Sequence, residues 1–317
     1  MARLAWQACI VRTCTSRPAT RMSFRIPGTN VLALLTGAII WGLIWYPYRG
    51  LGEYGMRAEW SSALTYGAAL ALWFVFCSGQ IKTLRPSTAL ALIGAVAGCA
   101  NVGLTIAVIH GEIMRVLLLF YLAPVWTVLF ARPLLGERLG AAGLAIVALA
   151  LAGAIIMLWQ PAAGLPLPAT KAECLGLAAG VAFALSNVLA RKASGHSGGE
   201  KTFWVLACSC AIGFAAAVAG GGPLLPPQEL ATSQVPVWMP VTLIALIGIV
   251  LLFGNLVVQF GLSHTPANRA IVIYLFELVV AAFASWLLAG EVMSPQEWMG
   301  GAMIIIASLV SARLEKS

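Results

Sequence analysis

The sequence predicts an all-α polytopic membrane protein, with ten transmembrane helices arranged as two inverted five-helix repeats. Two properties of the composition predict this class: hydrophobic residues make up 61% of the 317 residues, and charged residues make up only 9%. A soluble domain carries roughly a quarter of charged residues, so this chain would expose too much apolar surface in water. The third observation, a repeat of the first half in the second, predicts the inversion.

Apolar runs of about 20 residues, the length that a spanning helix needs, follow one another along the chain. Short connections rich in Gly, Pro and charged residues separate them. Ser294-Pro295-Gln296-Glu297 has the pattern of a helix start, with Ser as N-cap, Pro at N1 and Glu at N3. An interpretation with nine spans competes with ten. The ten predicted spans are 31–49, 58–77, 88–109, 113–132, 139–159, 173–192, 202–221, 237–261, 266–289 and 295–313.

The distribution of Lys and Arg predicts the orientation. If the N-terminus lies inside, 15 of the 19 basic residues fall on the cytoplasmic side, and only Arg49, Arg57, Arg115 and Lys171 fall outside. Cytoplasmic loops carry the excess of basic residues in membrane proteins. We therefore expect a multi-pass protein of the cell (inner) membrane with both termini in the cytoplasm. The net charge of +8 follows from the same bias and does not indicate nucleic-acid binding.

Residues 1–30 form a basic N-terminal arm without an acidic residue. The arm superficially resembles a transit peptide and lacks the apolar segment of a secretory signal. Two interpretations stand: a functional arm, which could be disordered, or a start placed too far upstream. Met22 opens a more ordinary membrane-protein start, so whether residues 1–21 belong to the native protein is open.

The second half of the chain repeats the first. A shift of 154 positions aligns residues 88–140 with 242–294. Because five spans is an odd number, the second half enters the membrane from the opposite side. The halves 31–159 and 173–313, joined by a loop at 160–172, thus form an inverted repeat, as in secondary transporters with substrate sites near the midplane. The aligned pairs are Gly94 and Gly248, Asn101 and Asn255, Arg115 and Arg269, and Gly136-Glu137 and Gly290-Glu291.

Two motifs carry a family resemblance: Tyr121-Leu122-Ala123-Pro124 before Leu134-Leu135-Gly136-Glu137, and a second copy from Tyr274-Leu275-Phe276-Glu277 to Gly290-Glu291. Over nearly all of residues 31–313 the chain resembles the drug/metabolite transporter superfamily, specifically its EamA-type exporters with ten helices. Trp41, Phe183 and the Tyr-Leu-x-Pro run are most similar to the aromatic amino-acid exporters. Leu278 stands where the second copy often has proline, which puts symmetric bending of the fourth and ninth spans in doubt.

The resemblance implies a transporter that exports small solutes by alternating access. Amino acids, most of all aromatic ones, are the implied substrates, and other metabolites or drugs are the alternative. Small relatives in this superfamily rely on a Glu in the first helix. The first predicted span, 31–49, contains no acid. This absence favours facilitated diffusion over proton coupling.

Polar side chains inside apolar spans are the candidates for the substrate site. In lipid an amide or a carboxyl group must find a partner or water, so these side chains should point into the bundle. Asn101 and Asn255 either form interhelical hydrogen bonds or line a central cavity. Glu277, the sole acid well inside a span, either binds substrate or braces helices. The predicted cavity residues are Trp41, Asn101, Thr105, Ala123, Phe183, Asn187, Asn255, Gln259 and Glu277.

Backbone and surface features complete the predicted site. Pro124 predicts a helix bend, because proline cannot donate a hydrogen bond to the carbonyl of Phe120. Arg49, Arg115, Arg191 and Arg269 lie near helix ends, where we expect their side chains to extend to the membrane surface.

Other functional classes lack support in the sequence. Residues 195–202 approach a P-loop but have Glu200 where the second glycine belongs. Asp is absent, which excludes a Ser-His-Asp triad, and the three His and seven Cys show no metal or redox spacing. We therefore expect no enzyme activity, no cofactor and no metal, with a membrane-embedded enzyme as the alternative. The expected partners are a small-molecule substrate and the lipid bilayer, not nucleic acid. The oligomeric state is open, and a monomer is compatible with the sequence.

Overall fold

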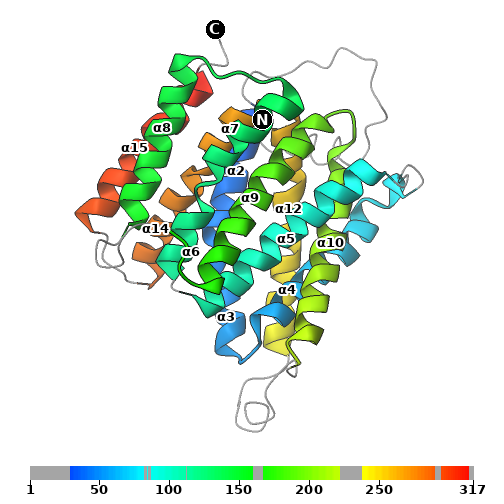
Figure 1. Ribbon diagram of the computed structural model, residues 1–317. Coiled ribbons are helices and arrows are strands. Elements are labelled where there is room, and N and C mark those ends of the chain that lie inside the picture. The colour runs from blue at the N-terminus through cyan, green and yellow to red at the C-terminus, as the bar shows by residue number, and fades with distance from the viewer. Residues whose placement is uncertain are drawn as a thin grey trace, which may run out of the picture.

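The computed structural model is helical throughout the residues it describes (Figure 1). These are residues 29–81, 84, 87–111, 113–159, 167–221, 238–289 and 294–313. Both chain ends, most of the basic arm, the 222–237 connection and Gly290-Glu291 lie outside them.

Helices occupy all ten predicted ranges, and three ranges contain two helices each. Eight candidate spans, taking successive helices together, are long and apolar enough to cross a membrane. Helices α4 and α15, over the second and tenth ranges, are not among these eight, so ten spans stays a prediction. The main helices are α2 Thr29–Leu43, α3 Trp45–Glu53, α4 Ala58–Phe76, α5 Thr88–His110, α6 Ile113–Phe120, α7 Ala123–Leu135, α8 Ala141–Leu158, α9 Lys171–Lys192, α10 Gly198–Ala219, α12 Trp238–His264, α13 Ala267–Tyr274, α14 Phe276–Ala289 and α15 Pro295–Arg313.

Large apolar side chains cover the outer surface of the bundle. Val75 and Phe76 on α4, Leu287 on α14 and Leu309 on α15 are more than half exposed, and exposed residues of this kind occur on most of the helices. A soluble monomer rarely exposes contiguous apolar patches of this extent. The composition argument is therefore supported by where the apolar side chains lie: the chain is a multi-pass membrane protein whose surface faces lipid.

Side-chain caps fix several helix starts at the membrane boundary. Helix α10 begins with a capping box, in which Ser197 Oγ accepts from the Glu200 N–H and the Glu200 carboxylate accepts from the Ser197 N–H. The start predicted at Ser294 is confirmed: Ser294 Oγ accepts from the Glu297 N–H at 3.2 Å, and Glu297 Oε2 accepts from the Ser294 N–H at 2.6 Å. These contacts satisfy N–H groups that have no partner inside the helix.

Three of the spans are interrupted. The first breaks at Ile44 between α2 and α3, the fourth at Tyr121-Leu122 between α6 and α7, and the ninth at Leu275 between α13 and α14. Pro124 is the second residue of α7, just after the fourth-span break. A shift of 154 aligns Tyr121 with Leu275. The fourth and ninth spans thus break at equivalent positions, although the second break has no proline.

The two halves of the sequence interleave in space. Within the described residues, α5 packs most extensively against α9 and α10, and α12 packs most extensively against α2 and α4. Helices α8 and α15 lie side by side at one edge of the bundle (Figure 1). Nearly all of the largest helix contacts therefore join a helix of one half to a helix of the other. The halves do not form two separate five-helix bodies.

Glycines allow the closest of these crossings. A Cβ added to Gly94 on α5 would meet the carbonyl of Trp204 on α10, and one added to Gly248 on α12 would lie 2.9 Å from the Ala68 Cβ on α4. Gly94 and Gly248 are partners in the predicted repeat, so equivalent glycines serve equivalent crossings. Small residues are the usual means of close helix approach in membranes, where van der Waals packing drives association.

We predict that Gly94→Ala destabilises the fold, because the new methyl group meets backbone rather than a movable side chain. Overpacking of this kind costs about 1–3 kcal/mol. Thermal unfolding in detergent, followed by tryptophan fluorescence, should show a lower midpoint for this variant. Gly52→Ala is the matched control, because no atom lies within 4 Å of its added Cβ. Equal midpoints for the two variants would contradict the account of this crossing.

Candidate functional site

The two equivalent breaks are joined by one hydrogen bond. Tyr121, at the break of the fourth span, donates its hydroxyl to Glu277 Oε1 at 3.0 Å. Glu277 is the second residue of α14, directly after the break of the ninth span. Its carboxyl group therefore lies at a helix N-terminus, where the helix dipole favours negative charge. Of the predicted site residues, Glu277 is thus placed where two broken helices meet.

Aromatic rings form a layer next to this bond. The Phe183 ring on α9 packs against Phe120 with centroids 5.3 Å apart and against Tyr274 with centroids 5.7 Å apart. Phe120 also packs edge-on against Tyr121. Trp41 on α2 packs against the buried cluster that contains Tyr274. The structure therefore brings Phe183 and Trp41 to the same cluster around Tyr274.

The breaks are covered by small residues of neighbouring helices. The Phe120 carbonyl, which Pro124 cannot bond, would lie 2.5 Å from a Cβ added to Gly180 on α9. The Glu277 carbonyl would lie 2.8 Å from a Cβ added to Gly42 on α2. Each break thus packs its backbone against a helix that has no side chain at the contact, so protein covers the backbone there.

The predicted amide face of α5 has an explicit partner. Asn101 Nδ2 donates to Ser209 Oγ on α10 at 3.1 Å, and Thr105 Oγ1 donates to the Asn101 carbonyl at 2.9 Å. Asn255 on α12 instead donates to the Leu251 carbonyl of its own helix at 2.9 Å. Ala123 is buried in an apolar cluster. Asn101 therefore fits the interhelical-bond interpretation, while Asn255 forms no side-chain bond to a second helix within the described residues.

Asn187 and Gln259 are buried with one polar atom each unpartnered. Asn187 is 7% exposed and Gln259 is 5% exposed. Within the described residues, neither Asn187 Nδ2 nor Gln259 Oε1 has a hydrogen-bond partner. An unpartnered buried polar atom costs about 1–3 kcal/mol, so a site that retains two of them is a candidate for binding a polar ligand.

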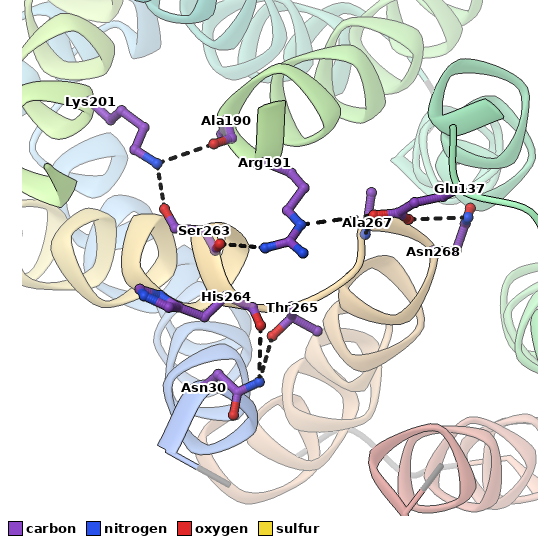
Figure 2. Close-up of polar contacts among 10 residues, drawn as sticks. All are labelled: Asn30, Glu137, Ala190, Arg191, Lys201, Ser263, His264, Thr265, Ala267 and Asn268. Atoms are coloured by element: carbon purple, nitrogen blue, oxygen red, sulfur yellow. Dashed lines mark hydrogen bonds and ion pairs between the residues drawn. The ribbon is translucent and has the colours of Figure 1, made fainter. Parts of the chain in front are cut away.

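A polar cluster closes the end of the bundle at which α9 and α12 finish (Figure 2). Glu137, in the connection after α7, accepts from the Ala267 N–H at 3.3 Å and from Asn268 Nδ2 at 3.4 Å. Its Oε1 also lies 3.8 Å from Nε of Arg191 on α9. One carboxylate therefore ties the α7 end to α9 and to the start of α13.

Lys201 and Arg191 meet in this end cluster on a single serine. Figure 2 shows both side chains directed at Ser263, at the end of α12, from two different helices. Lys201 Nζ donates to Ser263 Oγ and, at 3.1 Å, to the Ala190 carbonyl, while Arg191 donates to the Ser263 carbonyl. The hydropathy pattern of the sequence does not reveal this cluster, because it identifies Lys201 only as a basic residue beside the seventh predicted span.

A second ion pair joins the start of α6 to the opposite end of α9. Arg115 Nε lies 3.1 Å from Glu173 Oε1, and Arg115 Nη2 donates to Glu173 Oε2 at 3.2 Å. Arg115 is 16% exposed and Arg191 is 29% exposed in their side chains, and a carboxylate pairs with each of them. That these side chains extend to the membrane surface stays a prediction. Their ion pairs hold the fourth span to α9 at both ends.

Comparisons with known proteins agree with this fold. Residues 170–313 match the EamA-like transporter family. An uncharacterized transporter of Archaeoglobus fulgidus is 28% identical over 203 residues, covering 64% of this chain and 68% of its own length. A crystal structure with 18% identity covers 92% of this chain and 100% of its own chain with a TM-score of 0.73, a likeness that concerns the fold. Together the first two findings support a membrane transporter of the drug/metabolite transporter superfamily.

We predict that Tyr121 and Glu277 are energetically coupled. Tyr121→Phe and Glu277→Gln, alone and together, form a double-mutant cycle whose interaction term should be about 0.6 kcal/mol, with about 1.7 kcal/mol as the upper range for polar pairs between membrane helices. Unfolding in mixed micelles measures the term. Tyr46→Phe with Glu277→Gln is the control cycle, because Tyr46 is exposed on the surface of α3. An interaction free energy of zero in the Tyr121 cycle would contradict a stabilising hydrogen bond between Tyr121 and Glu277.

Proposed function

We propose that this chain exports amino acids, aromatic ones in particular, across the cell inner membrane by alternating access. The single observation that carries the proposal is the pair of equivalent helix breaks joined by Tyr121 and Glu277. Broken helices at membrane depth occur where protein or a water-filled site covers the backbone. In secondary transporters such breaks build the substrate site between inverted repeats.

The aromatic layer supports a solute with an aromatic ring. Phe120, Phe183 and Tyr274 present ring faces and edges beside the breaks. A further ring inserted among them would gain about 0.5–1.5 kcal/mol per aromatic pair beyond the burial of its area. This chemistry agrees with the resemblance of Trp41, Phe183 and the Tyr-Leu-x-Pro run to aromatic amino-acid exporters.

The helix packing supports the inverted repeat and supports a division into two moving units. The contact of α5 with α9 corresponds by the repeat to that of α12 with α2, and the contact of α7 with α9 corresponds to that of α14 with α2. Two ion pairs, formed by Arg115 and by Glu137, join the fourth span to α9, and Gly180 allows close packing between them. The units that rock are therefore groups drawn from both halves: α5 to α7 with α9, and α12 to α14 with α2.

Transport runs down the solute gradient in this proposal. Helix α2 contains no acidic residue, and the Glu277 carboxyl group is engaged by Tyr121. Glu277 then shapes the substrate site and does not carry protons. The cytoplasmic end is the one that carries Lys201 and Arg191, as the distribution of basic residues predicts.

Efflux from proteoliposomes tests the proposal. Purified protein should release labelled phenylalanine or tryptophan without an imposed pH gradient, and alanine more slowly. Trp41→Ala and Phe183→Ala should slow the efflux of aromatic substrates more than that of alanine, because each variant removes ring contacts. Leu129→Ala is the control, since Leu129 is 56% exposed on the outer surface of α7.

Two results would contradict the proposal. If vesicles with the wild-type protein release no amino acid, amino acids are not its substrates. Uphill accumulation driven by a pH gradient and abolished in Glu277→Gln would replace the uncoupled mechanism with proton coupling through Glu277.

A further inference from the structure

Lys201 is a fully buried cation. The residue is 0% exposed, and its side chain donates to two neutral acceptors, the Ala190 carbonyl and the Ser263 hydroxyl. None of the ion pairs among the described residues includes Lys201. The adjacent Glu200 carboxylate is committed to the Ser197 N–H and to His196. Burying a charge is costly unless an opposite charge accompanies it.

The surroundings of Lys201 favour an anion. Arg191 approaches the same serine, so two cations converge on Ser263, and Glu137 forms an ion pair with Arg191. Lys201 is also the fourth residue of α10, near the helix end where the dipole disfavours positive charge. The α10 dipole therefore does not account for a cation at this position, and the carbonyl end of α9, where Ala190 lies, holds the charge without an ion pair among the described residues.

Two of the unpartnered amide atoms, on Asn187 and Gln259, belong to residues one helical turn further into the bundle. Asn187 precedes Arg191 by four residues on α9, and Gln259 precedes Ser263 by four residues on α12, so each lies on the face of its helix that carries the cluster residue. Helices α9 and α12 pack against each other. A hydrogen-bond donor, Asn187 Nδ2, and an acceptor, Gln259 Oε1, are therefore left open beneath the end cluster.

We propose that Lys201, Asn187 and Gln259 recognise the zwitterionic head group of the transported amino acid. The Lys201 ammonium and the Asn187 amide donate to the carboxylate, and the Gln259 carbonyl accepts from the ammonium. The inference rests on the proposed function and assigns the head group to residues other than Glu277. The substrate class it names is free α-amino acids rather than amines or neutral aromatic drugs.

The position of the aromatic layer fits this assignment. Phe183 precedes Asn187 by four residues on α9 and packs against Tyr274 and Phe120. The rise of four helical residues is about 6 Å, comparable to the reach of a benzyl side chain from its α-carbon. A head group at Asn187 therefore puts the ring of the same molecule among Phe183, Tyr274 and Phe120.

A purely structural role for Lys201, as a tie between α9, α10 and α12, predicts something different. If Lys201 only connects the helices, its removal should slow the efflux of every solute alike. If Lys201 binds the substrate carboxylate, its removal should slow only the efflux of solutes that have a carboxylate. Phenylalanine and 2-phenylethylamine differ by that group alone, so together they separate the two roles.

The experiment compares efflux of labelled phenylalanine and 2-phenylethylamine from proteoliposomes. Lys201→Met should lower phenylalanine efflux about tenfold or more, the size expected for a hydrogen bond to a charged group, and change phenylethylamine efflux less than twofold. Lys192→Met is the matched control, an exposed lysine at the same end of α9, and should change neither. Asn187→Asp, which keeps the shape and adds a negative charge, should reduce phenylalanine efflux and increase that of the amine.

The outcomes separate the two proposals. Equal loss for both solutes in monodisperse Lys201→Met protein, or no loss, overturns the head-group assignment and leaves amino-acid export intact. If Lys201→Met does not fold, unchanged selectivity in Asn187→Asp overturns the assignment instead. Wild-type vesicles that release no amino acid overturn the proposed function and this inference with it.

Discussion

A backbone group that loses its helical partner inside a bilayer must be covered by protein or water, and the arrangement of this bundle follows from that constraint. Pro124 cannot supply the helical N–H donor to the Phe120 carbonyl, and Gly180 lets α9 approach that carbonyl. The equivalent break in the ninth span lies against Gly42 on α2. Tyr121 and Glu277 then join the breaks to each other. Groups whose exposure to lipid would cost free energy, such as the Phe120 carbonyl and the Glu277 carboxyl group, therefore lie together at the candidate site.

Close packing at small residues explains why the halves interleave. Gly94 and Gly248 let each third-span helix of the repeat cross a helix of the other half, and Gly153 and Gly300 do the same for α8 and α15. At such crossings backbone lies within contact distance of the facing helix, which leaves little room for relative sliding. Rotatable side chains make the contacts of the Lys201, Arg191 and Ser263 cluster, and such contacts accommodate motion more easily. The proposed alternation therefore opens and closes the bundle at its ends.

Much of the fold could be predicted from the sequence because lipid imposes simple rules. Helix length follows from bilayer thickness, and the start at Ser294 followed from its capping residues. The break at Leu275 could not be predicted, because no proline marks it. Asn101 and Asn255, equivalent by sequence, differ in the structure because Ser209 stands opposite only one of them.

The candidate site was predicted in part for the same reason. Glu277 and Phe183 were recognisable, since an acid or an aromatic face inside an apolar span is conspicuous in one sequence. Lys201 was not, because its burial depends on Ala190 and Ser263, residues far apart in the chain that reach it only in the folded bundle. Local sequence gives the chemistry of a side chain, whereas burial and partners depend on long-range contacts.

Protection of a cysteine at the fourth-span break tests most directly whether the paired breaks form the solute site. Leu122→Cys in a cysteine-free background should react with a small water-soluble thiol reagent, and saturating phenylalanine should slow the reaction. Ser194→Cys, exposed between α9 and α10, should react at the same rate with and without phenylalanine. A Leu122→Cys rate that phenylalanine leaves unchanged, or no reaction at all, would contradict a solute site at the paired breaks.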